Sequence, residues 1–177
     1  MPSDHKQFQA RRVVSGVNGD GKSTIVLDEN TTTRAVTDGF TVADVWQADT
    51  IPASVDAKDT LDGTVALAPP AEGVVVRFAS FPPDSEWDAA AGYESALGDL
   101  QAGDAYTADD AISGLHVTET IDIVTIVSGE LYAVLEDSET RLRPGDTFVQ
   151  RGTKHTWSNR SDRSATFVAT MIPATRG

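Results

Sequence analysis

The sequence contains no cysteine, which excludes disulfide bonds, thiolate nucleophiles and thiolate metal sites. It also lacks any apolar run close to the ~20 residues that a bilayer-spanning helix needs. Its N-terminus, MPSDHKQFQARR, has no apolar stretch of the kind found in secretory signals. We therefore expect a soluble, cytoplasmic protein that does not contact a membrane.

Positive charge is also scarce in this sequence. The 14 Lys and Arg residues stand against 27 Asp and Glu residues, which gives a formal net charge of −13. Such a chain repels polyphosphate backbones and anionic lipid surfaces, so we do not expect nucleic acid as a partner. The 40% of hydrophobic residues indicates a globular protein, and residues 1–177 are enough for one domain with a substantial core.

The composition divides this domain into four segments. Residues 1–10 are polar and predict a flexible tail in which His5 is solvated. Residues 11–81 carry strand patterns, and residues 84–113 form an acidic, alanine-rich insertion that predicts a short helix or a loop. Residues 114–173 contain a dense series of short strand patterns separated by turn residues. Many short strands with such punctuation predict an all-β sandwich or barrel.

Residues 16–23 match the phosphate-binding loop pattern GxxxxGK(S/T) letter for letter. That pattern binds phosphate only where its lysine and serine begin a helix. Here Thr, Ile, Val and Leu follow, which favours a strand. The Asn-Gly-Asp-Gly run at 18–21 instead predicts a hairpin turn between RRVVSGV and STIVLD.

Two further strand patterns precede the insertion, FTVADVWQA and GVVVRFASF. The second ends at two prolines, which cannot donate to a strand ladder, and we predict it to be a central strand. We expect Trp46, in the first pattern, to belong to the core. For Arg77, in the second, two alternatives stay open. It faces solvent, as most arginines do, or it points inward and anchors a ligand carboxylate.

The insertion carries three aromatic residues, Trp87, Tyr93 and Tyr106. Loops of this length often carry function, and these rings suit a lid that closes over a ligand. A simple connection between strands is the alternative.

The candidate site lies in residues 114–159, which hold two of the three histidines. His116, Thr118 and Asp122 all occupy even positions. Because alternate residues of an extended strand point to one face, an imidazole, a hydroxyl and a carboxylate should look the same way.

A second imidazole comes from a separate strand. The Arg-Gly-Thr-Lys run at 151–154 predicts a turn that leads into His155, and Trp157 follows at the same alternation. Side chains from two strands can then converge inside a narrow barrel. We predict a pocket for a small organic molecule with at least one polar oxygen, contacted by Thr118, Trp157 and, if it points inward, Arg77.

The same convergence predicts a site for a divalent metal, with His116, His155 and Asp122 as ligands. Two imidazoles and one carboxylate form a facial triad with open positions for water or substrate. Iron, zinc, manganese and nickel all accept these donors. Thr118 is expected beside the site rather than as a ligand.

This block resembles the cupin superfamily. The first cupin motif is matched by His116, by Thr118 in place of a second histidine, by Asp122 in place of glutamate, and by Gly129. The second cupin motif is matched by Gly145, Gly152, His155 and Asn159. The resemblance implies a jelly-roll β-barrel, here with an N-terminal strand extension and an insertion.

Three functions stay open at this point. The first is a metal-dependent enzyme such as an oxidoreductase, for which the resemblance supplies oxygenases, decarboxylases and isomerases as precedents. The second is metal-free acid and base catalysis by a histidine and a carboxylate. The third is a non-catalytic domain that binds a small molecule. A purely structural role, with both histidines hydrogen-bonded in the core, is the remaining alternative.

We also expect a homodimer. Residues 11–48 supply strand patterns outside the motif block, and these can extend a sheet across a subunit boundary. The resemblance implies the same, since cupins commonly dimerise through N-terminal strands. A closed twofold pair is the commonest oligomer in general.

Overall fold

The computed structural model describes residues 4–88, 92–93, 96, 98, 100, 102 and 112–177. Two short 3-10 helices are η1 (His5–Gln7) and η2 (Asp84–Glu86). The strands are, in chain order, β1 (Arg11–Val17), β2 (Ser23–Asn30), β3 (Arg34–Val36), β4 (Thr41–Ala48), β5 (Val74–Phe81), β6 (Thr120–Ser128), β7 (Leu131–Leu135), β8 (Glu139–Leu142), β9 (Thr147–Arg151), β10 (His155–Ser158) and β11 (Ala165–Pro173).

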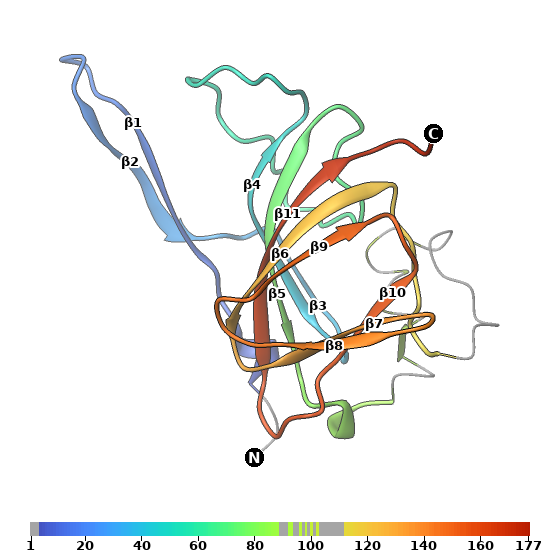
Figure 1. Ribbon diagram of the computed structural model, residues 1–177. Helices are drawn as coiled ribbons and strands as arrows, with labels where there is room; N and C mark the ends of the chain where they lie inside the picture. The colour runs from blue at the N-terminus through green and yellow to red at the C-terminus, as the bar shows by residue number, and fades with distance from the viewer. Residues whose placement is uncertain are drawn as a thin grey trace.

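Two sheets enclose the interior, and a two-stranded sheet stands apart from them (Figure 1). The larger sheet has six antiparallel strands in the order β3-β4-β5-β11-β6-β9, and the smaller has three in the order β10-β7-β8. Strand β5 is an interior strand, as its sequence predicts. The chain passes between the two sheets several times, as in a jelly roll. The predicted all-β jelly roll with an N-terminal strand extension is confirmed.

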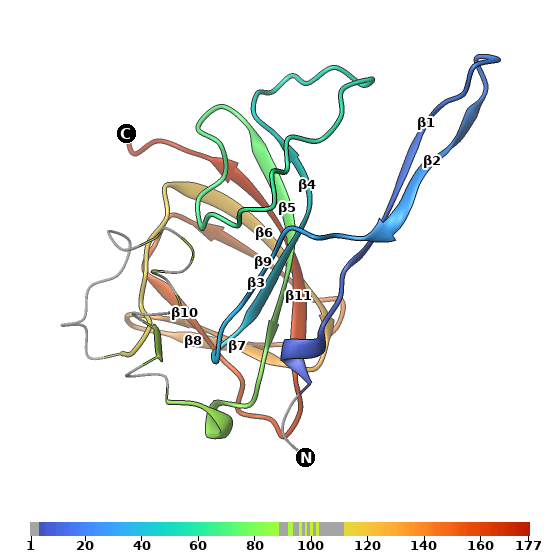
Figure 2. The ribbon, with the colours of Figure 1, turned by 180° about the vertical axis from the view of Figure 1, so that it is seen from behind.

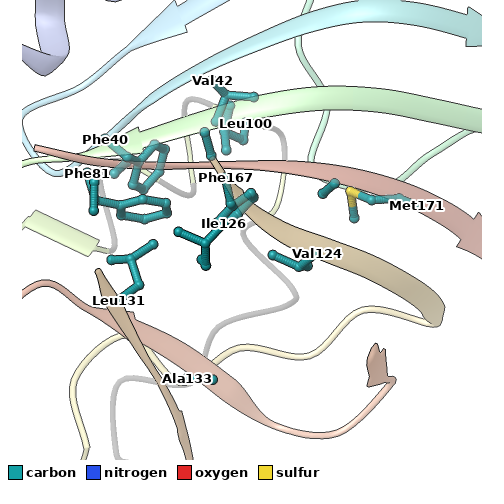
Figure 3. Close-up of a cluster of buried hydrophobic side chains, with 14 of the residues drawn as sticks. Phe40, Val42, Phe81, Leu100, Val124, Ile126, Leu131, Ala133, Phe167 and Met171 are labelled. Carbon is teal, nitrogen blue, oxygen red and sulfur yellow. The ribbon is translucent and has the colours of Figure 1, made fainter. Parts of the chain in front are cut away.

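The hydrophobic core fills the space between these two sheets (Figure 3). Strand β6 alternates, so that Val124 and Ile126 point into the core while Ile121 and Ile123 point outward. The ring centroids of Phe81 and Phe167 lie 5.5 Å apart at its centre. Burying one such side chain stabilises the fold by roughly 1.5–3 kcal/mol.

The segment that matches the phosphate-binding loop pattern is a hairpin, as predicted. Strands β1 and β2 pair in antiparallel register on either side of a turn closed by a 2.9 Å hydrogen bond from Asn18 N–H to the Lys22 carbonyl. Gly21 has a φ of 76°, which favours glycine. Because Ser23 begins a strand, no helix N-terminus faces this loop to bind phosphate.

Two side chains lie elsewhere than the sequence suggests. The prediction that His5 is solvated is wrong: it is only 4% exposed, its Nε2 lies 3.2 Å from the Thr37 carbonyl oxygen, and burial lowers its pKa below the ordinary value. The predicted core position of Trp46 is also wrong. A bulge after Asp44 places Trp46 opposite Val76, half-buried on the outward face of β4. A segment 32 residues away buries His5, whereas a local bulge turns Trp46 outward.

Candidate functional site

One cavity between the two sheets brings together the candidate site residues. Its volume is about 80 Å³, which is room for several water molecules or a small organic group. All six residues singled out in the sequence line it, namely Arg77, His116, Thr118, Asp122, His155 and Trp157. Its remaining wall is mainly apolar, with Phe40, Leu67, Phe81, Leu100, Phe167 and Met171.

Reciprocal backbone hydrogen bonds bring the two imidazoles together. The N–H of His116 donates to the carbonyl of His155, and the N–H of His155 donates to the carbonyl of His116, each at 3.0 Å. The short bridge extends the smaller sheet beyond β10 and places the two ring centroids 4.4 Å apart. His116 and His155, 39 positions apart in the sequence, thus line the same cavity because this backbone bridge joins their two segments.

Hydrogen bonds also fix which nitrogen of each ring carries the proton. His116 Nδ1 lies 2.9 Å from the Gly114 carbonyl oxygen, and His155 Nδ1 lies 3.0 Å from the Thr153 carbonyl oxygen. A carbonyl oxygen only accepts, so each Nδ1 must carry a hydrogen. In the neutral rings each Nε2 therefore holds a lone pair, available to a proton donor or a metal ion.

Both imidazoles are held in the neutral form. Burial lowers the pKa of His155 to about 3, and the nearby His116 contributes, although the hydrogen bond to Thr153 acts in the opposite direction. Burial also lowers the pKa of His116, opposed by its hydrogen bond to Gly114. Because the unfolded chain takes up a proton near pH 6.5, these residues make the fold less stable as the pH falls from there toward 3.

We expect the His155 imidazole to remain neutral throughout the mildly acidic range, because its protonated form cannot be hydrated in the cavity. An NMR pH titration checks this, since the three histidines give few imidazole signals and a His155→Gln variant identifies the right one. Its chemical shifts should show no inflection between pH 7 and about pH 4. An inflection near pH 6.5 would contradict the closed, dry site.

Asp122 is the carboxylate of the cavity. It is 5% exposed, and no group among the described residues hydrogen-bonds its Oδ1. Burial raises its pKa above the ordinary value, although a hydrogen bond from the Thr120 hydroxyl and the charge of Arg77 act in the opposite direction. Thr120 Oγ1 also lies 2.7 Å from Thr118 Oγ1. Sequence reasoning missed Thr120, although its even position on the same strand was a usable signal.

Arg77 points inward, so the alternative in which it faces solvent is wrong. Its Nε lies 2.9 Å from Asp44 Oδ1, and its Nη2 donates to Asp44 Oδ2 at 3.1 Å. The same guanidinium donates to the carbonyl oxygens of Ala66 and Leu67. The carboxylate that Arg77 anchors thus belongs to the protein itself. Sequence reasoning missed Asp44, whose only signal was an acid inside an apolar strand.

We expect Asp44→Ala to destabilise the protein by about 3–5 kcal/mol, because it leaves the Arg77 charge buried without a partner. Urea unfolding measures this. The double variant Asp44→Leu/Arg77→Met should recover most of the loss, since neither charge then remains to be solvated. Equal losses in the single and double variants would show that the lost packing, and not the unpaired charge, causes the effect.

Described residues of the insertion form one side of the cavity. Tyr93 Oη donates to the Trp157 carbonyl at 3.1 Å and accepts from the Thr156 hydroxyl at 3.2 Å. The Tyr93 ring lies so close to Gly114 that a Cβ there would be only 2.3 Å from it, so a glycine is needed for this packing. The φ of Gly114 is 79°, which favours glycine as well. Trp87 stacks against Tyr93 with ring centroids 4.9 Å apart. The third aromatic residue of the predicted lid, Tyr106, lies outside the described residues.

Comparison with known proteins identifies the region around this cavity. Residues 105–171 match the family model of the cupin domain. The chain contains a cupin domain. The sequence resemblance is thereby confirmed. Among the described residues, no helix has the length and apolar character that a membrane span requires.

The curated relatives match this chain over only a short stretch of their own sequences. A 48-residue stretch is 50% identical to "Phomopsin biosynthesis cluster protein C'" of Diaporthe leptostromiformis and covers 27% of this chain and 25% of that protein. A 47-residue stretch is 47% identical to "Oryzines biosynthesis cluster protein J" of Aspergillus oryzae and covers 26% of each protein. The matched stretch is thus about a quarter of the length of these curated relatives.

A solved structure with a similar fold is a "Cupin 2 conserved barrel domain protein" from Salinispora arenicola. The TM-score is 0.44, with 12% sequence identity over 80% of this chain and 82% of that chain.

Cupin resemblance implies a metal ion, and the two imidazoles fit one in part. Metal-binding histidines usually donate their other ring N–H to a carbonyl or carboxylate, as His116 and His155 do here. Within the described ranges, however, no three His, Cys, Asp or Glu side chains gather closely enough to hold a metal ion. Asp122 lines the same cavity but does not complete such a group. The predicted facial triad is not assembled here.

Proposed function

We propose that the cupin domain binds a small, largely apolar organic molecule that donates a hydrogen bond, in the cavity between its two sheets. The observation that carries this proposal is Asp122 Oδ1, which is buried in the cavity without a hydrogen-bond partner among the described residues. A buried polar atom without a partner is costly, and a ligand N–H or O–H would satisfy it.

The other polar groups of the cavity favour the same kind of ligand. The two imidazoles offer Nε2 lone pairs, which accept hydrogen bonds. Arg77 already donates to Asp44 and two carbonyl oxygens, and the Thr118 hydroxyl is within hydrogen-bond distance of Thr120. The cavity is therefore rich in acceptors, which suits an alcohol, phenol or amine better than a carboxylate ligand.

The apolar part of the ligand would contact the aromatic wall. Trp157 lies between polar and apolar groups, with its ring centroid 6.1 Å from His155 and 5.0 Å from Phe167. Thr118 lines the same cavity. The names of the fungal relatives assign them to clusters for phomopsin and oryzines biosynthesis, which supports a ligand taken from a biosynthetic pathway.

We expect Asp122→Leu to abolish ligand binding without unfolding the protein. Leucine has the same branching and number of side-chain heavy atoms as aspartate, and its larger volume can extend into the cavity that Asp122 lines. Because it removes a buried polar atom, the free energy of unfolding should stay equal or rise. The measurement is an NMR titration with small alcohols and phenols, each paired with its methyl ether, which lacks the donor. The native protein should prefer the donor-bearing compound by about tenfold or more.

Asp56→Leu is the matched control, because Asp56 is exposed in the loop between β4 and β5. This variant should bind as the native protein does. If the native protein binds each alcohol no more tightly than its ether, and Asp122→Leu binds both as the native protein does, then Asp122 does not contact the ligand.

A metal-dependent enzyme, such as an oxidoreductase, decarboxylase or isomerase, is the second candidate function. It is favoured by the two Nε2 lone pairs, which the Nδ1 hydrogen bonds of His116 and His155 leave available. A divalent ion such as Fe²⁺, Zn²⁺, Mn²⁺ or Ni²⁺ bound there would polarise an oxygen atom of the substrate or of water. His116 and His155 would hold the ion, and Asp122 would accept a proton or a hydrogen bond from the substrate.

Equilibrium dialysis against Zn²⁺ tests this candidate independently of activity. We expect His116→Ala and His155→Ala each to weaken metal binding by about tenfold or more. His5→Ala, the matched control, removes a histidine outside the cavity and should bind Zn²⁺ as the native protein does. Binding should persist below pH 6.5, because these imidazoles need not lose a proton first. Equal Zn²⁺ binding by all four proteins would contradict a metal site at these histidines.

Metal-free proton transfer is a third candidate, and it would be centred on Asp122. A histidine with a pKa of about 3, such as His155, is a weak base at neutral pH. The raised pKa of Asp122 brings this carboxyl closer to the range in which a group exchanges protons with a substrate. The histidines would then orient the ligand rather than move its proton.

We further propose that the protein works as a homodimer. The hairpin β1–β2 forms a sheet of its own, hydrogen-bonded to neither of the two larger sheets. Such isolated hairpins are marginally stable in water, and a neighbouring subunit would stabilise this one.

A further inference from the structure

The outward side of the six-stranded sheet carries a row of hydroxyl groups at one end. Strand pairing places Thr41, Ser80, Thr166 and Ser128 side by side, from β4 across β5 and β11 to β6. We call these four side chains the hydroxyl row. The first three are only 0%, 2% and 6% exposed, whereas Ile123, also on the outward side, is 41% exposed. Another part of the chain must therefore cover this end of the sheet.

The N-terminal segment provides this cover. Helix η1 lies against the ends of β5 and β11 (Figure 2). The ring centroid of Phe8 lies 6.0 Å from that of Phe78 on β5, and His5 Nε2 lies 3.2 Å from the Thr37 carbonyl oxygen. The segment is thus held to the sheet at two points along its length.

A groove remains between the N-terminal segment and the sheet. Its volume is about 290 Å³, compared with about 80 Å³ for the cavity between the two sheets. Ser80, Ser128 and Thr166 of the hydroxyl row line it, and so do Asp4 and Gln7 of the N-terminal segment. Among the described residues, none lines both the groove and the cavity. The groove is therefore a separate space with polar walls.

The hydroxyl row is not fully hydrogen-bonded within the fold. Thr166 Oγ1 donates to Ser80 Oγ at 3.1 Å, which uses the hydrogen of Thr166. The hydrogen of Ser80 has no acceptor among the described residues. Thr41 Oγ1, beside Ser80, has no partner among them either. A buried hydroxyl with an unused hydrogen is costly, and a ligand oxygen in the groove would accept it.

The other groups of the groove define the ligand further. Asp4 Oδ1 accepts from the Ser164 hydroxyl at 3.2 Å, and Asp4 Oδ2 can accept from a ligand. The Gln7 amide can both donate and accept. Phe8 and Phe78 are half-buried and add an apolar surface for C–H groups. No Lys or Arg among the described residues lines the groove, so Asp4 disfavours an anionic ligand.

We propose that this groove is a second binding site, for a neutral polyhydroxyl compound such as a monosaccharide or a cyclic polyol. Each hydroxyl group of such a compound both donates and accepts, so one can accept from Ser80 while another donates to Asp4. The C–H groups of its ring can lie against Phe8 and Phe78. This ligand differs from that of the cavity, whose polar groups are mainly acceptors.

NMR titrations of the native protein with myo-inositol and D-glucose test the site. At least one of them should bind with a dissociation constant in the millimolar range, and the amide signals of Phe8 and Ser80 should shift while that of His155 does not. Cyclohexanol, which has a single hydroxyl, should bind in the groove at least about tenfold more weakly. D-Glucuronate should bind more weakly than D-glucose, because its carboxylate is repelled by Asp4.

Gln7→Ala should weaken polyol binding by about tenfold, because the side chain that both donates and accepts is lost. Gln9→Ala is the matched control, since Gln9 is exposed two residues away and does not line the groove. Ser80→Ala should weaken binding to a similar extent. Because Ser80 is buried, urea unfolding should accompany this variant and show that it remains folded.

Two results would overturn the second site directly. One is the absence of shifts at Phe8 and Ser80 with both polyols up to ~100 mM, which corresponds to negligible affinity. The other is equal polyol binding by the native protein, Gln7→Ala and folded Ser80→Ala.

Asp122→Leu separates the groove from the cavity between the sheets. Asp122 does not line the groove, so this variant should bind the polyols as the native protein does. Loss of polyol binding in Asp122→Leu would assign the polyol to the cavity. That result would overturn the second site and leave the function proposed for the cavity standing.

Discussion

The structure depends on the exclusion of water from a polar cluster between two sheets. Arg77, Asp44, His116, His155 and Asp122 all lie where hydration is lost, and each charged or polar group must find a partner in the protein or change its protonation state. Arg77 and Asp44 satisfy each other, and the histidines stay neutral and donate to backbone carbonyls. Asp122 keeps a carboxyl oxygen that has no hydrogen-bond partner among the described residues and, unlike Asp44, no ion-pair contact with Arg77.

This pattern sets the chemical character of the candidate site. The positive charge of Arg77 is paired with Asp44, so the cavity does not select anions. In these tautomers each imidazole uses its N–H to hydrogen-bond the backbone and keeps Nε2 as an acceptor. What the cavity offers is therefore a set of acceptors within an aromatic and aliphatic wall, closed on one side by Tyr93 from the insertion. The same lone pairs make the two histidines suitable for a metal ion, although the residues that the structure describes supply fewer donors than a facial triad requires.

The two sides of the larger sheet follow from the same strand alternation. Inward residues of β6, such as Asp122 and Val124, build the cavity and the core, while outward residues, such as Ile121 and Ile123, face solvent. Several apolar residues on this outward side are exposed to solvent. The same alternation thus builds both the cavity wall and the exposed side of the sheet.

The sequence by itself determined the features that depend on local periodicity. Alternation and turn residues predicted the strands, the hairpin in place of a phosphate-binding loop, and the common face of His116, Thr118 and Asp122, because these arise within a few neighbouring residues. Tertiary structure decided the rest. Arg77 meets Asp44, 33 residues away, His5 is buried against a distant segment, and a bulge turns Trp46 outward. The lowered histidine pKa values and the unpaired oxygen of Asp122 likewise appear only when the two sheets close and remove water, because desolvation is a property of the assembled interior and not of any short stretch of chain.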